Sequence, residues 1–309
     1  MTKLAPLPEA GATSVIFFGT PEVAVRHLES LVSFGCNVVL VVTRPDVRRG
    51  RGSEASPSPV KIAAQKLGIE VTHSLDDVLS VAKLDVKTIG VVVAYGEVLP
   101  SAVLEKVPMI NVHFSLLPRW RGAAPVERAI LAGDAKTGVC IMRVGEKLDE
   151  GEVYARREIL IDDLDTTDSL REKLNDLSVD LVRDAVLNGC GTGVAQAGEV
   201  LYAKKIRSSD LQIDWDTSAT QILRQIRVGG AFSFVSGKRL KILQAKIVGL
   251  DSTGKRPGQI CVVTKTECVI ATADSGLSLI ELQPEGKAVM QVEGWLNGAR
   301  LNADSVFGS

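Results

Sequence analysis

Three side chains in this sequence have the types and the spacing for one kind of carbonyl chemistry. Asn111 and His113 alternate with apolar residues over 110–114, which predicts a short strand with both polar side chains on one face. Asp149 follows in a predicted loop. An amide and an imidazolium can stabilise an oxyanion, and a carboxylate can orient the imidazole or accept a proton. The trio favours acyl or formyl transfer to an external nucleophile; a polar cluster whose groups satisfy one another is the alternative.

Other chemistries find less support in the residues. Neither Ser nor Cys stands in a triad context, and Ser115 has no second base within its motif. One His, one Asn and one Asp make a poor metal site, so no metal is expected. Gly19 lies at a strand-to-helix junction, but a GxGxxG fingerprint is missing, which disfavours a nicotinamide dehydrogenase.

Length and composition indicate an ordinary globular protein. The chain has 309 residues, enough for two domains, with 45% hydrophobic and 24% charged residues. Its formal net charge of -1 means that any nucleic-acid role must come from local patches. The five cysteines form no CxxC pair, as is usual in a reducing compartment. The N-terminal residues lack a signal-peptide core, and no stretch approaches the ~20 apolar residues of a membrane span, so a cytoplasmic protein is expected.

The first part of the chain alternates between predicted strands and helical segments. Strands are expected at 14–18, 37–43, 69–72, 88–95, 110–114, 137–144 and 152–161. A long amphipathic helix is expected at 167–187. This alternation predicts an α/β domain with a mostly parallel, doubly wound sheet. Polar groups at the carboxyl ends of such strands lie at one edge, where ligands usually bind.

After Leu201 the composition changes. One helix is expected at 218–227, followed by short β-type runs at 239–248, 259–264, 268–272 and 277–283. Regularly spaced short strands of this kind predict a small β-barrel. Residues 204–256 contain eleven Lys or Arg against four Asp. A solvated face and a positive nucleic-acid platform explain this bias equally well.

A second basic stretch follows the second predicted strand. Residues 44–61 form a long connection without periodicity, which contains Arg48, Arg49 and Arg51 beside glycines. Long loops in compact domains tend to be functional, and arginines next to glycines can approach phosphates closely. A solvated surface loop is the alternative interpretation.

Several motifs resemble those of a known family. NVHFSLLPRWRGAAP and the later LDEGEV are similar to the 10-formyltetrahydrofolate-dependent formyltransferases. FGTPEVAV, TRPDVRRGRGSEASPSPVK, VVVAYGEVLP, YAKKIRSSDLQIDW, GKRLKI and ELQPEGKAVM resemble the members that formylate methionine on initiator tRNA. The resemblance extends from about Ser14 to Asn297, nearly the whole chain.

The resemblance implies a fold, a reaction and a set of residues. It implies a tail at 1–13, a Rossmann-like formyltransferase domain at 14–190, a linker at 191–208 and an OB-like, tRNA-binding barrel at 209–309. The reaction would transfer the formyl group of 10-formyltetrahydrofolate, a cosubstrate, to the α-amine of methionine on initiator tRNA. Asn111, His113 and Asp149 would be catalytic. The tetrahydrofolate site would be lined by Ser115, Leu116, Leu117 and Pro118, with Val93, Ala94, Tyr95 and Gly96 nearby. The tRNA-binding residues would be Arg48, Arg49, Arg51, Lys204, Lys205 and Arg207. A monomer without membrane contact is expected.

Three positions depart from the family pattern. Ser53 and Glu54 stand where lysines are common, and RVGGAFSF at 227–234 replaces a Pro-rich aromatic segment. Phe114 stands where a small residue is frequent, on the face away from Asn111 and His113. A formyltransferase for a small amine is disfavoured by the basic loop and the barrel, which a small acceptor would not need. A nucleic-acid-binding protein without catalysis would not need the trio.

Overall fold

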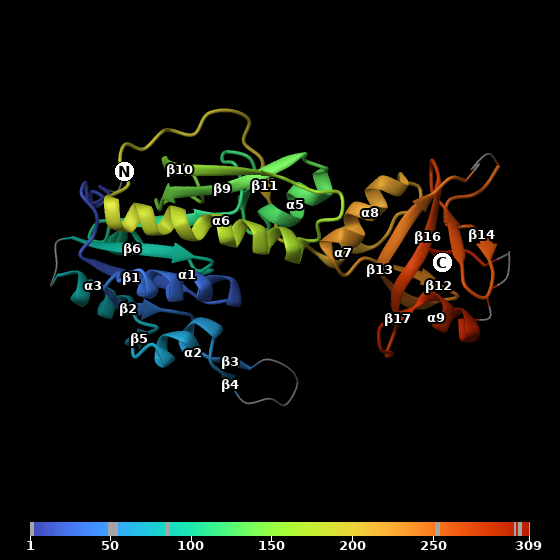
Figure 1. The fold of residues 1–309 in the computed structure, drawn as a ribbon, viewed down its shortest axis with the longest axis horizontal. Helices are drawn as coiled ribbons and strands as arrows, with labels where there is room; N and C mark the ends of the chain where they lie inside the picture. The colour runs from blue at the N-terminus through green and yellow to red at the C-terminus, as the bar shows by residue number, and fades with distance from the viewer. Residues whose placement is uncertain are drawn as a thin grey trace. The chain divides into compact units, whose positions relative to one another are not determined.

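The computed structural model describes residues 3–48, 55–83, 87–250, 254–299, 301 and 305–308 (Figure 1). The backbone divides into two compact units, each with a sheet of its own. The first contains Met1–Pro125, Lys136–Leu160 and Arg171–Ala203, and the second contains Val126–Ala135, Ile161–Leu170 and Lys204–Ser309. The domain boundaries expected near residues 190 and 208 stay a prediction.

A seven-stranded sheet forms the centre of the first unit. In sheet order, its strands are β10 (Val153–Leu160), β9 (Lys136–Arg143), β7 (Met109–His113), β6 (Thr88–Val93), β1 (Ser14–Gly19), β2 (Val38–Val42) and β5 (Val71–Thr72). The strands from β7 to β5 are parallel, whereas β9 and β10 run antiparallel to their neighbours. This order confirms the predicted mostly parallel, Rossmann-like sheet.

The sequence explains why these strands are central. Every residue of β1 and β6 is buried, as expected for apolar runs that are covered on both faces. The helices of the first unit are α1 (Glu22–Ser33), α2 (Pro59–Lys66), α3 (Leu75–Ala82), α4 (Ser101–Leu104) and the part of α6 (Thr167–Asn188) from residue 171. The Ser58 side chain caps α2 by accepting a hydrogen bond from Lys61 N at 3.0 Å, and Pro59 occupies the first turn.

Two short ladders were not expected from the sequence. β3 (Val47–Arg48) pairs with β4 (Ala55–Ser56) where the sequence predicts an irregular loop. β8 (Arg121–Gly122) pairs in parallel with β11 (Tyr202–Ala203), so residues far apart in the chain lie side by side in the first unit. Two-residue strands leave no periodic signal in a sequence.

The second unit is built around a curled antiparallel sheet. Its strands are β12 (Phe232–Val235), β13 (Lys238–Val248), β16 (Gly276–Pro284), β15 (Cys268–Ala271) and β14 (Ile260–Val263), with β17 (Met290–Gln291) pairing with β16. Its helices are α5 (Pro125–Ala132, from residue 126), α7 (Ser208–Leu211), α8 (Ala219–Val228) and α9 (Val292–Ala299). Trp215, Ile222 and Leu240 belong to the apolar core of the sheet. The predicted OB-like architecture is confirmed. Across the described residues, no helix is both long and apolar enough to cross a membrane.

A buried histidine joins two helices of the first unit. His27 on α1 places Nε2 2.7 Å from Ser178 Oγ on α6, and that hydroxyl donates to Asn175 O at 2.7 Å. The other ring nitrogen, Nδ1, lies 3.3 Å from the Val23 carbonyl oxygen. Burial lowers the pKa of His27 from 6.5 to about 4, with a smaller contribution from the charge of Arg26.

The stability of the protein should depend on pH through His27. Since the pKa is lower in the folded state, the unfolded chain binds more protons between pH 6.5 and about 4. His27 therefore does not lower the free energy of unfolding above pH 6.5. As pH falls from 6.5 to about 4, the free energy of unfolding decreases by up to roughly 3 kcal/mol. Urea unfolding at several pH values should show this loss in the parent protein and a much smaller one in His27→Gln. His73→Gln, at an exposed histidine, is the control. An equal loss in all three proteins would contradict the assignment.

Candidate active site

The trio residues lie at the carboxyl edge of the first sheet. β7 ends at His113, beside β6 on one side and β9 on the other, and Asn111 pairs with Val92 and Met142 in these strands. The chain fills the sheet outward from β1 to β5 and then returns to β6 on the other side of β1. Ligands in open α/β sheets bind outside the carboxyl ends at such a switch point.

His113 is held between two acceptors. Its Nε2 lies 2.9 Å from the carbonyl oxygen of Trp120, and its Nδ1 lies 3.6 Å from Asp149 Oδ2. Because a carbonyl can only accept, Nε2 carries a hydrogen and Nδ1 faces the carboxylate. The side chains of His113 and Asp149 are 6% and 11% exposed, so the pair is largely shielded from water. The structure thus brings together two of the three predicted residues.

Both residues that contact the His113 ring have a strained backbone. Trp120 has φ +64° and Asp149 has φ +51°, in the left-handed region that costs a residue with a side chain roughly 1–2 kcal/mol. Asp149 Oδ2 accepts a hydrogen bond from Gly122 N at 2.8 Å. Strain of this kind clusters at functional sites, where the surroundings hold it.

Asn111 is half-buried and shares a face of β7 with His113. Within the described part of the chain, no hydrogen bond engages its side-chain amide. The amide can therefore meet an incoming group directly, whereas His113 Nε2 must first leave the Trp120 carbonyl.

The predicted folate residues fall into two groups by burial. Ser115, Leu117 and Pro118 are buried; Ser115 Oγ donates to Arg119 O at 2.6 Å, and Leu117 packs with Cys140. These three residues shape the loop after β7, and Leu116 is the half-buried member of the segment.

The predicted folate residues at the end of β6 also fall into a buried and an exposed group. Val93 and Tyr95 are buried, and the Tyr95 ring meets Phe18 edge-on with 5.6 Å between centroids. Burial, followed by the charge of Glu97, raises the pKa of Tyr95 to about 12. Ala94 and Gly96 are exposed and have φ of +48° and +83°. Their backbone is thus the accessible part of the segment.

The predicted tRNA residues belong to both units. Arg48 is exposed on β3 of the first unit, and Arg49, Arg51, Ser53 and Glu54 lie outside the described residues. Lys204, Lys205 and Arg207 belong to the second unit and are exposed. The Lys204 carbonyl accepts from Arg128 Nε at 2.9 Å, so the backbone there is fixed while the side chains remain exposed.

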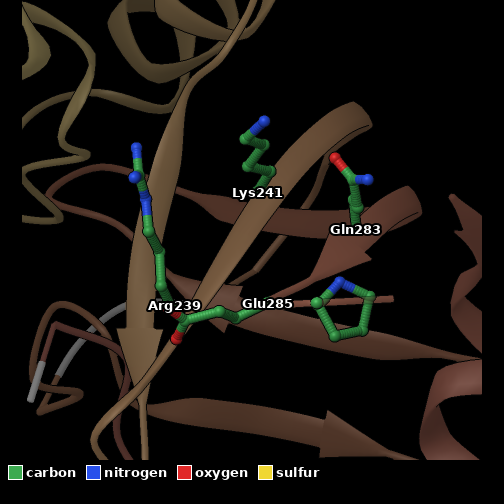
Figure 2. A pocket seen from close by; sticks show the side chains of 6 residues that line it. Arg239, Lys241, Gln283 and Glu285 are labelled. Carbon is green, nitrogen blue, oxygen red and sulfur yellow. The ribbon is translucent and has the colours of Figure 1, made fainter. Parts of the chain in front are cut away.

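A cationic cavity lies on the sheet of the second unit. Figure 2 shows Arg239 and Lys241 of β13 and Gln283 of β16 pointing to the same side. The cavity has a volume of about 180 Å³ and is completed by Pro284, Glu285 and Gly286. The Arg239 guanidinium stacks 3.7 Å from the centroid of the Phe232 ring. A cation, a stacked arginine and an amide on one outer face are typical of nucleic-acid platforms.

Some residues around the trio carry no signal in the sequence. Trp120 contributes a backbone carbonyl, and Gly122 contributes a backbone amide. Gln196 donates to the Asp149 carbonyl, although it lies in a Gly-rich segment that is predicted to be a linker. The sequence shows an arginine at position 121, beside the predicted catalytic strand, but it does not show that Arg121 bonds to Gln196. Within the described residues, no group of three His, Cys, Asp or Glu side chains is placed to hold a metal ion.

An open, mostly parallel sheet with an amide and a histidine–aspartate pair at its carboxyl edge defines an α/β enzyme for group transfer at a carbonyl carbon. A model described as formyl transferase matches residues 13–186, and one described as formyl transferase, C-terminal domain, matches residues 205–300. The chain belongs to the formyl transferase family.

Relatives agree with this assignment. A protein of Jannaschia sp. (strain CCS1) named methionyl-tRNA formyltransferase is 39% identical over 306 residues, which cover 95% of this chain and 99% of that protein. HypX from Aquifex aeolicus in complex with tetrahydrofolic acid has a TM-score of 0.63 at 17% identity, over 94% of this chain. The match spans about half of HypX, 47% of its length. The sugar 3N-formyl transferase WlaRD has a TM-score of 0.64 at 16% identity, over 90% of this chain and 99% of that one. These two structures support the fold.

Gly151 is required by the close packing of the loop that carries Asp149. A Cβ at this position would lie 2.0 Å from the Arg143 carbonyl oxygen on β9. Gly145, in the same connection between β9 and β10, would place its Cβ 4.0 Å from the nearest atom, on Leu4.

Gly151→Ala should therefore destabilise the protein by about 1–3 kcal/mol, because the loop must move away from β9. Gly145→Ala is the matched control and should change the free energy of unfolding by less than about 0.5 kcal/mol. Chemical denaturation measures both. Equal stability of the two variants would show that the loop can shift without cost.

Proposed function

We propose that this protein transfers the formyl group of 10-formyltetrahydrofolate to the α-amine of methionine esterified to initiator tRNA. The observation that carries the chemistry is the His113–Asp149 pair beside the unengaged Asn111 amide at the end of one strand. The choice of acceptor comes from the similarity to the Jannaschia protein over nearly the full length of both chains.

Each trio residue takes one part of the reaction. The amine attacks the formyl carbon, and negative charge develops on the formyl oxygen. Asn111 N–H donates to that oxygen, and His113 adds a second donor once Nε2 exchanges the Trp120 carbonyl for the substrate. Asp149, or a water that it holds, accepts the proton of the attacking amine. The bond from the formyl carbon to N10 of the folate then breaks, and N10 takes up a proton.

We propose the same folate segments as the family resemblance implies. Ser115, Leu116, Leu117 and Pro118 would form one wall, with Leu116 as its accessible side chain. The backbone of Val93, Ala94, Tyr95 and Gly96 would form a second, since Ala94 and Gly96 are exposed there. Both segments follow neighbouring parallel strands, so they begin at the same edge of the sheet.

The acceptor would be held by basic groups of both units. Arg48, Arg49 and Arg51 supply charge after β2, and Lys204, Lys205 and Arg207 supply it before α7. We add the cavity of Arg239 and Lys241 as a phosphate contact of the barrel. Because phosphate contacts position RNA without reading bases, these residues would contribute affinity more than discrimination.

We also propose that the enzyme acts in the cytoplasm as a monomer. The five cysteines are free thiols, as is usual in a reducing compartment. One chain supplies all three trio residues, so a second copy is not needed at the site. Sedimentation of the purified protein tests the oligomeric state.

The test of the proposed function is incubation with 10-formyltetrahydrofolate and methionyl initiator tRNA, followed by detection of formylmethionine. Elongator methionyl-tRNA and a nucleotide-linked amino sugar are the control acceptors. Formylation of initiator tRNA above both controls supports the proposal. Formylation of the amino sugar alone would show that the acceptor is a small amine and not tRNA.

Asn111→Ala and His113→Ala should each lower turnover by roughly 10²–10³, because each removes a donor to the oxyanion. The Michaelis constants for both substrates should change much less, since neither group is needed to hold the ground state. Steady-state kinetics separate these effects. Near-normal turnover in both variants would show that Asn111 and His113 do not take part in the reaction.

Lys241→Ala should weaken tRNA binding and lower the slope of log affinity against log salt by about one. This variant leaves Arg239 and its stacking on Phe232 in place. Lys265→Ala, at an exposed lysine between β14 and β15, is the matched control. Filter binding over a range of salt measures both. An unchanged slope in Lys241→Ala would show that the cavity does not contact phosphate.

A further inference from the structure

Gln196 connects three parts of the first unit through one side-chain amide. Its Nε2 donates to the carbonyl oxygens of Asp149 and Gly151, each at 2.8 Å. Its Oε1 accepts from Arg121, from Nε at 3.0 Å and from Nη2 at 2.7 Å. The amide thus makes all four of the hydrogen bonds available to it. Its orientation is determined, because a flipped amide would face two carbonyls with oxygen and a guanidinium with nitrogen.

Arg121 is itself fixed in place. It is 8% exposed, and its Nη1 lies 3.2 Å from Glu150 Oε1. Its backbone N–H donates to Leu201 O at 2.9 Å in the ladder of β8 and β11. Arg121 therefore holds Glu150 directly and the residues on either side of it through Gln196.

The segment that carries Gln196 is attached to the same region by its backbone. Val194 and Val153 exchange two hydrogen bonds of 2.9 Å, and Tyr202 pairs with Arg121. Residues 194–203 thus run from the start of β10 to the loop after β7. They form part of the frame around Asp149, although their sequence reads as a linker.

The strained backbone of Asp149 makes this frame necessary. With φ at +51°, Asp149 tends to relax unless its neighbours hold it. Its carboxylate is held by Gly122 N, and its carbonyl is held by Gln196. The second contact does not touch the carboxylate, but it sets the backbone from which the carboxylate reaches His113.

We propose that Gln196 is a positioning residue for the reaction, acting through the backbone of Asp149 with Arg121 as its anchor. Its effect on catalysis depends on the function proposed above, because Asp149 must serve formyl transfer for its position to matter. Its effect on the geometry of Asp149 does not depend on any substrate.

Gln196→Glu tests this role with almost no change in size. The carboxylate still accepts from Arg121, but it cannot donate to the Asp149 and Gly151 carbonyls and repels them. Gln65→Glu is the matched control, because it makes the same chemical change at an exposed residue of α2. We expect kcat to fall about 10–100-fold in Gln196→Glu, with KM for both substrates little changed and with the protein still folded at the assay temperature.

Two further measurements separate positioning from general support of the fold. In an Asp149→Ala background, Gln196→Glu should lower kcat no further, since a residue that acts through Asp149 has nothing left to position. Hydrogen exchange at the Gly122 amide, which donates to Asp149, should become roughly tenfold faster in Gln196→Glu while α1 amides exchange as before.

Unchanged kcat in Gln196→Glu, an effect on KM alone, or an equal loss in the Asp149→Ala background would each overturn the proposal. Unchanged exchange at Gly122 would do so without any activity measurement. If the parent protein does not formylate methionyl-tRNA but the Gly122 amide is released, the proposed function fails and the positioning of Asp149 by Gln196 stands.

Discussion

The site depends on how one imidazole ring is held. His113 lies at the end of a buried strand with Trp120 O at 2.9 Å from one nitrogen and Asp149 Oδ2 at 3.6 Å from the other. Both partners are acceptors, so the ring can donate from each nitrogen only as an imidazolium. The Trp120 carbonyl places a hydrogen on Nε2, the nitrogen that can donate to a developing oxyanion, and the largely buried Asp149 carboxylate faces the other nitrogen.

The two contacts of the ring come from backbone that would not adopt its conformation alone. Trp120 and Asp149 both have positive φ, and Gly122 N links them by donating to the carboxylate. These backbone conformations are held by a frame in which Gln196 donates to the carbonyls of Asp149 and Gly151, and Arg121 holds Gln196 by donating to its amide oxygen. Preorganisation here is thus a property of several peptide groups and not of the trio alone.

The sequence predicts the parts of this arrangement that depend on periodicity. Alternation places Asn111 and His113 on one face of β7, and the alternation of strands and helices predicts the parallel sheet that carries their strand. Residue chemistry names Asp149 as a candidate, and the resemblance of LDEGEV to a family motif implies its catalytic role, but no pattern in the sequence predicts its contact with His113. Trp120 and Gly122 act through a backbone carbonyl and a backbone amide, so their side-chain types do not reveal these contacts. Gln196 depends on pairing between two-residue strands and on a single bridge at Val194, and neither leaves a pattern in the sequence.

The same loop couples the two halves of the proposed reaction. Ser115 to Pro118 form the proposed folate wall, and Trp120 to Gly122 hold His113 and Asp149, with only Arg119 between the two groups. Ser115 Oγ donates to the Arg119 carbonyl, so the buried start of the loop fixes the point where its second half begins. The Trp120 carbonyl in this second half is the group that occupies His113 Nε2. Asn111, which has no such competitor among the described residues, is ready before the donor arrives.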